Sequence, residues 1–353
     1  MLRDMHCHAC YGMPAQEAVD YFLRLKEENQ VDKINILSAP IIKEGGYFRL
    51  QNLHILQLKD MLYPYAFAYM GMWHEDGKKD YLKQLQDGIA QGFEGLKILE
   101  GKPDRQMQTG VRIWKPEFDE MFDYAEEQGI PVLMHVGDPA KFWDRSQATE
   151  YMLSRGWCYD GPGFLSLEEL YEDVWKLLDK HPKLRLTLAH FFFMSDNLKR
   201  AAEFLDAHPS VCFDITPGTE MYENFSNNWE ASREFFMKYA DRIYLGTDVN
   251  DFGQENYANH CGLYHTTREF MRGTEGVTWR NVECKPFGLP TDIADKITWQ
   301  NFIKVLGDDP KPVNYKKVLE ELDAIEAIKD TLCEKDLAEY ARVNAYFRNK
   351  VTE

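Results

Sequence analysis

The chain has 353 residues, a formal net charge of −17, 44% hydrophobic residues and seven cysteines. The hydrophobic fraction supports a sizeable core, and this length fits one large α/β barrel or two ordinary domains. The acidic balance argues against nucleic acid and anionic membranes as partners, because like charges repel, but it leaves a small-molecule substrate open. The cysteines are odd in number and, apart from Cys7 and Cys10, widely scattered, which indicates free thiols in a reducing compartment. No apolar run approaches the ~20 residues that span a bilayer, so we expect a soluble cytoplasmic protein.

Eight short apolar segments are predicted to be β-strands, and segments with apolar residues at helical spacing lie between them. The strands are predicted at residues 2–8, 34–37, 65–70, 95–99, 131–135, 184–190, 211–215 and 242–248. The helices are predicted at residues 14–28, 50–61, 82–89, 118–127, 167–178, 198–205 and 235–239. This alternation favours the α/β class and a parallel (β/α)8 (TIM) barrel, which needs about 250 residues. A doubly wound open sheet is the alternative.

The remaining residues divide into a loop region and a helical tail. Residues 249–290 are rich in Gly and aromatic residues and are predicted to be a loop region. Residues 297–306 are expected to form the eighth barrel helix, and residues 319–346 are rich in Glu, Lys and Ala, which is typical of a helix. We therefore expect a barrel over residues 1–307 and a helical C-terminal extension, residues 308–353, packed on it.

Two histidines stand near the start of the chain, at His6 and His8. Side chains two residues apart point the same way on a β-strand, so both imidazoles can reach one point beyond the strand's end. Imidazole nitrogens are common ligands of zinc and similar divalent metals. Such a pair alone is common by chance, and Cys7 between the two should point away and serve packing.

Further polar residues close other predicted strands. His135 ends the fifth strand, His190 the sixth and Asp248 the eighth. In a (β/α)8 barrel the carboxyl ends of the strands open on one face, where active sites lie. Any one of these residues is more often structural, but chance explains the whole set poorly. Lys97 lies within an otherwise apolar fourth strand and needs a partner; a simple ion pair with Asp248 or a neighbouring Glu is the alternative to a role at a metal.

The strand-end motifs together resemble the amidohydrolase superfamily, and within it the amidohydrolase-2 family of metal-dependent hydrolases and decarboxylases. The motifs are Asp4-Met5-His6-Cys7-His8, Val132-Leu133-Met134-His135, Leu188-Ala189-His190 and Leu245-Gly246-Thr247-Asp248, followed by the Asn-containing helix at residues 297–307. The resemblance spans roughly residues 1–307 and implies a TIM barrel. It leaves the tail unexplained and selects no substrate, because one scaffold carries several chemistries in this family.

The resemblance implies one divalent metal, with zinc expected and manganese as the alternative. Its ligands would be His6, His8, His135 and Asp248, and His190 and Asp248 would be the catalytic residues. In the two-metal branches of the superfamily, a carboxylated lysine bridges the metals, so Lys97 and His190 would be further ligands of a binuclear site. The implied activity is hydrolysis of a C–N or C–O bond of a small acidic or cyclic substrate. A non-oxidative decarboxylase is the alternative, and a catalytically inactive metal-binding barrel is a third reading.

Substrate contacts are expected from the loops that follow the strands. The candidates are Trp73, Arg105, Trp143, Arg145 and Tyr222, and the same loops carry His74, Lys102, Glu220, His260 and His265. Arginine can grip a carboxylate in a bidentate fashion, although each cation taken alone is better explained as a solvated loop charge. The dense aromatic residues at 191–193 and 222–229 suit a pocket wall, core packing or the subunit contact of a homo-oligomer.

Overall fold

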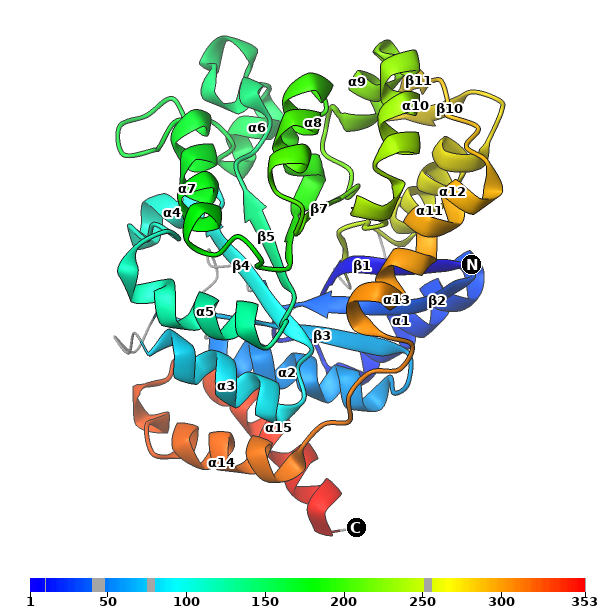
Figure 1. Cartoon of the computed structure of the whole chain (residues 1–353). Helices are drawn as coiled ribbons and strands as arrows, with labels where there is room; N and C mark the ends of the chain where they lie inside the picture. The colour runs from blue at the N-terminus through cyan, green and yellow to red at the C-terminus, as the bar shows by residue number, and fades with distance from the viewer. Residues whose placement is uncertain (10, 40–47, 75–79, 251–255, 353) are drawn as a thin grey trace. The chain divides into compact units, whose positions relative to one another are not determined.

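A computed structural model describes residues 1–9, 11–39, 48–74, 80–250 and 256–352 (Figure 1). The chain divides into two compact units, which are described in turn. The first contains residues 1–97, 245–265 and 298–353, and the second contains residues 98–244 and 266–297. Among the described residues, no helix has the length and apolar character needed to cross a membrane.

The strands are parallel and follow one another in chain order from β1 to β8, with β9 paired to β1. The alternation of strands and helices along the chain confirms the predicted (β/α)8 class. A doubly wound sheet would reverse its strand order at a switch point, and this order has no reversal. Residues 243–250 pair with β7 at their start and with β1 at their end, as the last strand of such a barrel does.

The first unit holds the N-terminal strands and the C-terminal helices. Its strands are β1 (Leu2–His8), β2 (Val31–Leu37), β3 (Ala66–Gly71), the start of β4 (Gly95–Gly101) and β9 (Val249–Asn250). Its helices are α1 (Ala15–Asn29), α2 (Phe48–Met61), α3 (Tyr81–Gln91), α13 (Asn301–Leu306), α14 (Tyr315–Glu326), α15 (Glu334–Thr352) and the first half of α11 (Tyr257–Arg272). The strands are buried along almost their whole length, as strands covered on both faces are.

The C-terminal helices pack on the helices of the first unit. His54 of α2 and Glu339 of α15 are both buried, and their Nδ1 and Oε1 atoms lie 2.9 Å apart. Arg342 also pairs with Glu339 and donates to the carbonyl of Gly12, in the loop that follows β1. The predicted helix at residues 319–346 is interrupted, because α14 ends at Glu326 and α15 starts with acidic residues that favour a helix N-terminus.

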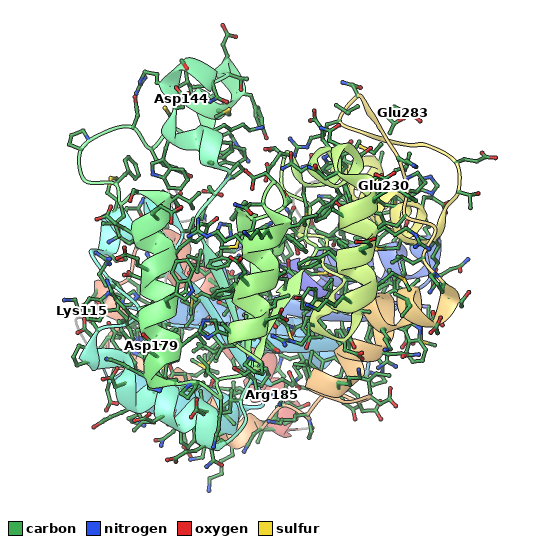
Figure 2. The ribbon with its side chains drawn as sticks, turned by 45° about the horizontal axis from the view of Figure 1, so that its top comes forward. Lys115, Asp144, Asp179, Arg185, Glu230 and Glu283 are labelled. Atoms are coloured by element: carbon green, nitrogen blue, oxygen red, sulfur yellow. The ribbon has the colours of Figure 1, made fainter. Side chains whose placement is uncertain are left out.

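The second unit holds the later strands and their helices. Its strands are the end of β4, β5 (Val132–Val136), β6 (Leu186–Leu188), β7 (Val211–Asp214), β8 (Ile243–Tyr244) and the hairpin β10 (Val277–Trp279) and β11 (Val282–Cys284). Its helices are α4 (Pro103–Thr109), α5 (Asp119–Glu127), α6 (Glu150–Arg155), α7 (Leu167–Lys180), α8 (Leu198–Ala207), α9 (Met221–Asn227), α10 (Trp229–Lys238) and α12 (Thr291–Asp295). The segment between β5 and α7, marked by Asp144 in Figure 2, has its own small core of Phe142, Met152 and Tyr159.

Three further predicted elements differ from the structure. The sixth strand ends at Leu188 rather than at His190, because residues 190–193 adopt left-handed backbone angles. The eighth strand is split into β8 and β9, with Asp248 at a φ of 61° directly before β9. The loop region predicted at residues 249–290 is wrong in part, since it contains the 16-residue helix α11 and the β10–β11 hairpin. Polar residues such as His260 and Thr267 are buried on α11, and this obscures the apolar period.

Candidate metal centre

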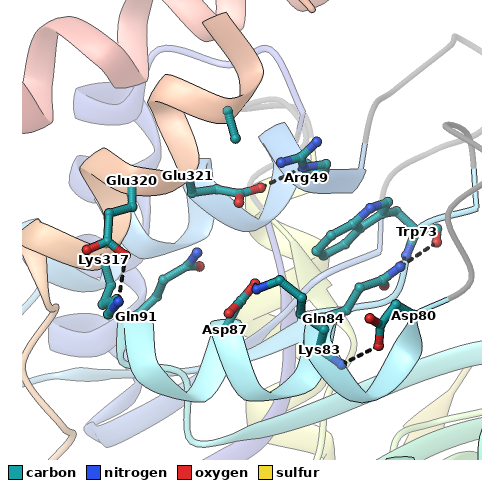
Figure 3. A pocket seen from close by; sticks show the side chains of 11 residues that line it. Arg49, Trp73, Asp80, Lys83, Gln84, Asp87, Gln91, Lys317, Glu320 and Glu321 are labelled. Atoms are coloured by element: carbon teal, nitrogen blue, oxygen red, sulfur yellow. Dashed lines mark hydrogen bonds and ion pairs between the residues drawn. The ribbon is translucent and has the colours of Figure 1, made fainter. Parts of the chain in front are cut away.

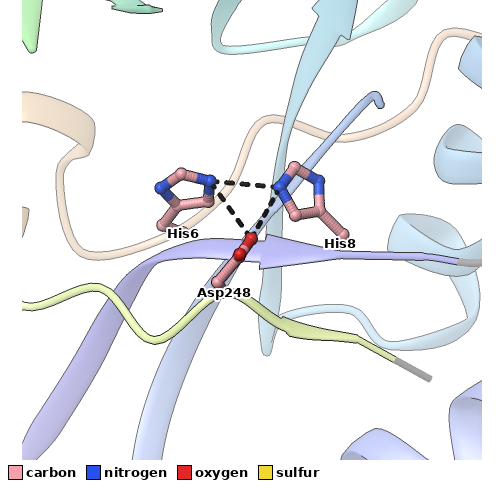
Figure 4. Close-up of side chains that lie close together, drawn as sticks. All are labelled: His6, His8 and Asp248. Atoms are coloured by element: carbon pink, nitrogen blue, oxygen red, sulfur yellow. Dashed lines mark hydrogen bonds and ion pairs between the residues drawn. The ribbon is translucent and has the colours of Figure 1, made fainter. Parts of the chain in front are cut away.

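Three predicted ligands converge in the first unit (Figure 4). The Nε2 atoms of His6 and His8 lie 3.0 Å apart, and Oδ1 of Asp248 lies 3.1 Å from His8 Nε2 and 3.6 Å from His6 Nε2. If two donor atoms each lie about 2.1 Å from one ion and meet it at the tetrahedral angle, they are about 3.4 Å apart. The three observed separations lie around this value. The donor set of two imidazoles and a carboxylate therefore fits one divalent cation.

The strand geometry explains why the two histidines meet. Alternation along β1 places His6 and His8 on one side, while Cys7 is fully buried with its sulfur 3.9 Å from the Tyr264 hydroxyl. His8 Nδ1 lies 3.0 Å from the Leu37 carbonyl oxygen. Because a carbonyl only accepts, this contact places a proton on Nδ1 and leaves Nε2 as the metal-binding atom.

Asp248 reaches the histidines from an unusual backbone conformation. Its φ of 61° lies in the left-handed region, which non-glycine residues seldom adopt and which is found at functional sites. Its backbone N–H donates to the carbonyl of His6 at 2.8 Å. The side chain is about half exposed, at 47%, so its carboxylate is open to solvent on one side.

Two charged residues lie beside these ligands. Lys97 is 1% exposed, and its Nζ lies 3.2 Å from His6 Nε2. Asp4 is fully buried, and burial raises the pKa of its carboxyl to about 6, against the opposing effect of hydrogen bonds from Thr247, the His6 backbone and Tyr264. The structure thus places Lys97 next to the predicted ligand His6, as the binuclear alternative requires, and its role at a metal stays a prediction.

The second unit brings His135 and His190 together. His190 Nε2 lies 3.1 Å from His135 Nδ1, and the ring centroids are 4.6 Å apart. The outer nitrogens face carbonyl oxygens, with His135 Nε2 3.0 Å from Gly137 and His190 Nδ1 3.3 Å from Thr216. Since carbonyls only accept, the outer nitrogens carry the protons of two neutral rings. The facing inner nitrogens then need an additional proton or a cation between them.

Two aspartates that the sequence reasoning missed hold this pair. Asp214 Oδ1 accepts from the backbone N–H groups of His190 and Thr216 at 2.8 and 3.0 Å. Asp138 Oδ1 lies 3.5 Å from His135 Nε2. Asp214 lies one residue before the end of the predicted strand 211–215, and Asp138 lies three residues after the predicted strand 131–135. The rule that selected the closing residue of each strand therefore did not identify them, and a window of a few residues around each strand end would have.

Asp138 is buried and ionised. Its Oδ2 atom accepts from Lys102 Nζ at 2.7 Å and from the Tyr159 hydroxyl at 2.6 Å. Burial alone would raise the pKa of this carboxyl, but Lys102 and His135 hold it well below its ordinary value. Glu220 differs, because burial raises the pKa of its carboxyl.

The five substrate candidates all have contacts within the chain. Trp73 exchanges backbone hydrogen bonds with the Gln84 side chain and lines a cavity of about 300 Å3 beside α3 and α14 (Figure 3). Arg105 is buried, 3.6 Å from Glu100. The other three are Trp143, which donates to the Leu165 carbonyl, Arg145, which binds Asp160 through two hydrogen bonds, and Tyr222, which is fully buried against Thr267. Their substrate roles stay predictions.

Comparisons with known proteins agree with the fold. The 2,6-dihydroxybenzoate decarboxylase from Rhizobium is 13% identical, with a TM-score of 0.54 over 86% of this chain and 98% of that chain. The 4-oxalomesaconate hydratase from Rhodopseudomonas palustris is 13% identical, with a TM-score of 0.53 over 93% and 100%. A manganese-bound dihydroxybenzoic acid decarboxylase from Polaromonas sp. JS666 is 12% identical, with a TM-score of 0.54 over 86% and 96%. At these identities the likeness concerns the fold.

The family of the protein is established by comparison of its sequence with family models. No curated protein matches the chain. A family model described as "Amidohydrolase" matches residues 4–307, which contain every predicted metal ligand and most of the chain. The protein therefore belongs to the amidohydrolase family.

Proposed function

We propose that this protein is a metal-dependent hydrolase that cleaves a C–N or C–O bond of a small acidic or cyclic substrate. The observation that carries the proposal is the convergence of His6 Nε2, His8 Nε2 and Asp248 Oδ1 within 4.8 Å. Membership of the amidohydrolase family supports a reaction of this class. The contact between His8 and the Leu37 carbonyl also supports the proposal. It fixes the orientation of the imidazole in advance, so metal binding costs less side-chain entropy.

His135 is proposed as the fourth ligand. It is the last residue but one of the parallel strand β5, and its Nε2 lies against the Gly137 carbonyl, which leaves Nδ1 as the metal-binding nitrogen. Imidazole and carboxylate donors suit zinc, and manganese is the alternative because it accepts the same oxygen and nitrogen ligands. A bound divalent cation would act as a Lewis acid and lower the pKa of a coordinated water to about 7.

The chain's own residues would then move the protons. The half-exposed carboxylate of Asp248 can accept a proton from the attacking water. The Thr216 carbonyl fixes the ring of His190 and Asp214 fixes its backbone. Once its Nε2 has taken up a second ring proton, it can give that proton to the leaving group or hydrogen-bond a developing negative charge. A positioned acid–base group contributes roughly 10²–10⁴-fold in rate.

Non-oxidative decarboxylation is the second candidate. In that reaction the bond between the substrate carbon and its carboxylate breaks, carbon dioxide leaves, and a proton takes its place on the carbon. The facing nitrogens of His135 and His190 favour it, because they need one additional proton or a cation, and a proton held there can be delivered to carbon. Lys102 adds a partly exposed cation in the same unit.

The test measures metal and reaction together. Purified protein is analysed for metal, stripped with a chelator, reloaded with zinc or manganese, and assayed on a panel of lactones, cyclic amides and aromatic acids. Metal-dependent ring opening supports the hydrolase, and carbon dioxide release supports the decarboxylase. Protein that binds no divalent metal even after reconstitution would exclude both.

A further inference from the structure

Asp4 is a buried carboxylate for which the proposed reaction has no use. It is 0% exposed. Oδ1 accepts from the backbone N–H of His6 at 2.9 Å. Oδ2 accepts from the hydroxyls of Thr247 and Tyr264, the latter at 2.8 Å. Burial of a carboxylate is costly unless hydrogen bonds compensate it, and here three donors from three segments do so.

Two of the three donors of Asp4 belong to the segments that supply the ligand triad. One is the backbone of the ligand His6. Another is Thr247, the residue before the ligand Asp248, and its Oγ1 also accepts from the Val249 N–H at 3.2 Å. The Asp248 N–H donates to the His6 carbonyl at 2.8 Å. A ring of hydrogen bonds thus fixes the backbone on both sides of Asp248 and joins it to His6.

We propose that Asp4 is a positioning residue that sets the distance between His6 and Asp248 and thereby the affinity for the metal. This inference rests on the proposed metal-dependent function. The left-handed backbone of Asp248 supports it, because a non-glycine residue keeps that conformation only where its surroundings hold it. Tyr264 of α11 completes the arrangement by binding the same carboxylate oxygen as Thr247.

Thr247→Val gives the sharpest test, since valine nearly preserves the shape of threonine and removes the hydroxyl donor. Thr247→Ser restores the hydroxyl and should rescue the effect. Asp4→Asn and Tyr264→Phe test the other partners. The full-length protein is titrated with zinc against a competing chelator, and the visible spectrum of the cobalt-loaded form reports ligand geometry. We expect Thr247→Val and Asp4→Asn to weaken zinc binding about 10- to 100-fold and to shift the cobalt spectrum, with Thr247→Ser close to wild type.

Asp32→Asn is the matched control. Asp32 of β2 binds Arg3 of β1 at 2.7 Å, so this variant removes another carboxylate contact of the same strand and should leave zinc affinity unchanged. The melting temperature of each metal-free variant separates folding from positioning. If Asp4→Asn fails to fold, Thr247→Val and Tyr264→Phe decide the question.

The possible results separate the two proposals. Unchanged zinc affinity in folded Thr247→Val and Asp4→Asn, beside a wild type that binds zinc, overturns the positioning role and leaves the proposed function standing. The same holds if stability falls while affinity and the cobalt spectrum are unchanged. A wild type that binds no divalent metal overturns the proposed function and the positioning role with it.

Discussion

His190 Nε2 lies 3.1 Å from His135 Nδ1, and a backbone carbonyl faces the outer nitrogen of each ring. The contact joins the histidine proposed as a fourth metal ligand to the histidine proposed as the acid–base group. Four nitrogens in a row therefore hold either three protons or two protons and a cation. Metal binding through His135 Nδ1 requires the second arrangement, in which a cation takes the place of the third proton. Three of the predictions concern this metal site or Lys97.

His190→Asn is expected to keep one metal per chain and to lose about 10²–10⁴-fold in turnover, because it removes an acid–base group and leaves the other ligands. Metal content and turnover are measured on the same sample. His208→Asn, which changes a histidine of α8's end outside the site, should affect neither. A drop of about one metal equivalent would instead make His190 a ligand, and full turnover with full metal would leave it a packing residue.

His6→Ala and His135→Ala should each bind metal much more weakly and still fold. Each removes one donor of a site with few protein ligands, whereas the barrel core does not depend on the metal. Circular dichroism tests the fold, and elemental analysis after dialysis tests the metal. Full metal occupancy in either variant would show that the residue concerned is no ligand.

The chemical state of Lys97 distinguishes a site with one metal from a site with two. For a mononuclear site we expect about one metal per chain and an unmodified lysine, whose Nζ lies 3.2 Å from His6 Nε2. Native mass spectrometry and elemental analysis measure both quantities. Two metals together with the added mass of one carbon dioxide on Lys97 would establish the bridged site, and Lys97→Met should then lose one metal.

Glu339 couples stability to pH. Burial would raise the pKa of its carboxyl, but His54 and Arg342 hold it below the ordinary value of 4.5. A lowered folded pKa means that the ionised group stabilises the fold above about pH 4.5, and that this contribution is lost as pH falls through the folded pKa. At pH 7 we expect Glu339→Gln to lower the free energy of unfolding by about 1–3 kcal/mol, because it removes a buried carboxylate that binds His54 and Arg342.

Urea unfolding of chelator-treated protein measures this effect. The difference in the free energy of unfolding between wild type and Glu339→Gln should shrink as the pH falls from 4.5 through the folded pKa, because wild type then loses its carboxylate as well. Glu320→Gln, which removes an exposed partner of Lys317, should change stability by less than about 1 kcal/mol. If the difference in unfolding free energy between wild type and Glu339→Gln stays constant down to pH 3, the proposed role of the Glu339 carboxylate is wrong.

Much of the fold could be predicted because its signals are local. The alternation on β1 is a two-residue period, and it correctly placed His6 and His8 on one side. The buried runs at β2, β3 and β5 are short and bounded, so their positions agree with the sequence to within a few residues. Asp248 was found because it closes a predicted strand.

The rest depends on contacts that no local pattern contains. The left-handed turn at residues 190–193 appears in the sequence as a continuation of an apolar strand. The function of Asp4 depends on Tyr264, 260 residues away, and on a helix whose buried side chains are partly polar. The residues around Asp138 in the sequence do not indicate that Lys102 and Tyr159 both donate to its Oδ2 atom.

The bond between Thr247 and Asp4 spans 243 residues, and this distance sets the order of events when the chain is made. On the ribosome β1 emerges before β9, and it carries two of the proposed ligands and a carboxylate that becomes buried. Its partners β9 and Thr247 emerge more than two hundred residues later. During that interval one edge of β1 lacks its neighbour, and an open strand edge can pair wrongly with other chains. The proposed metal site can therefore form only after β9 has left the ribosome.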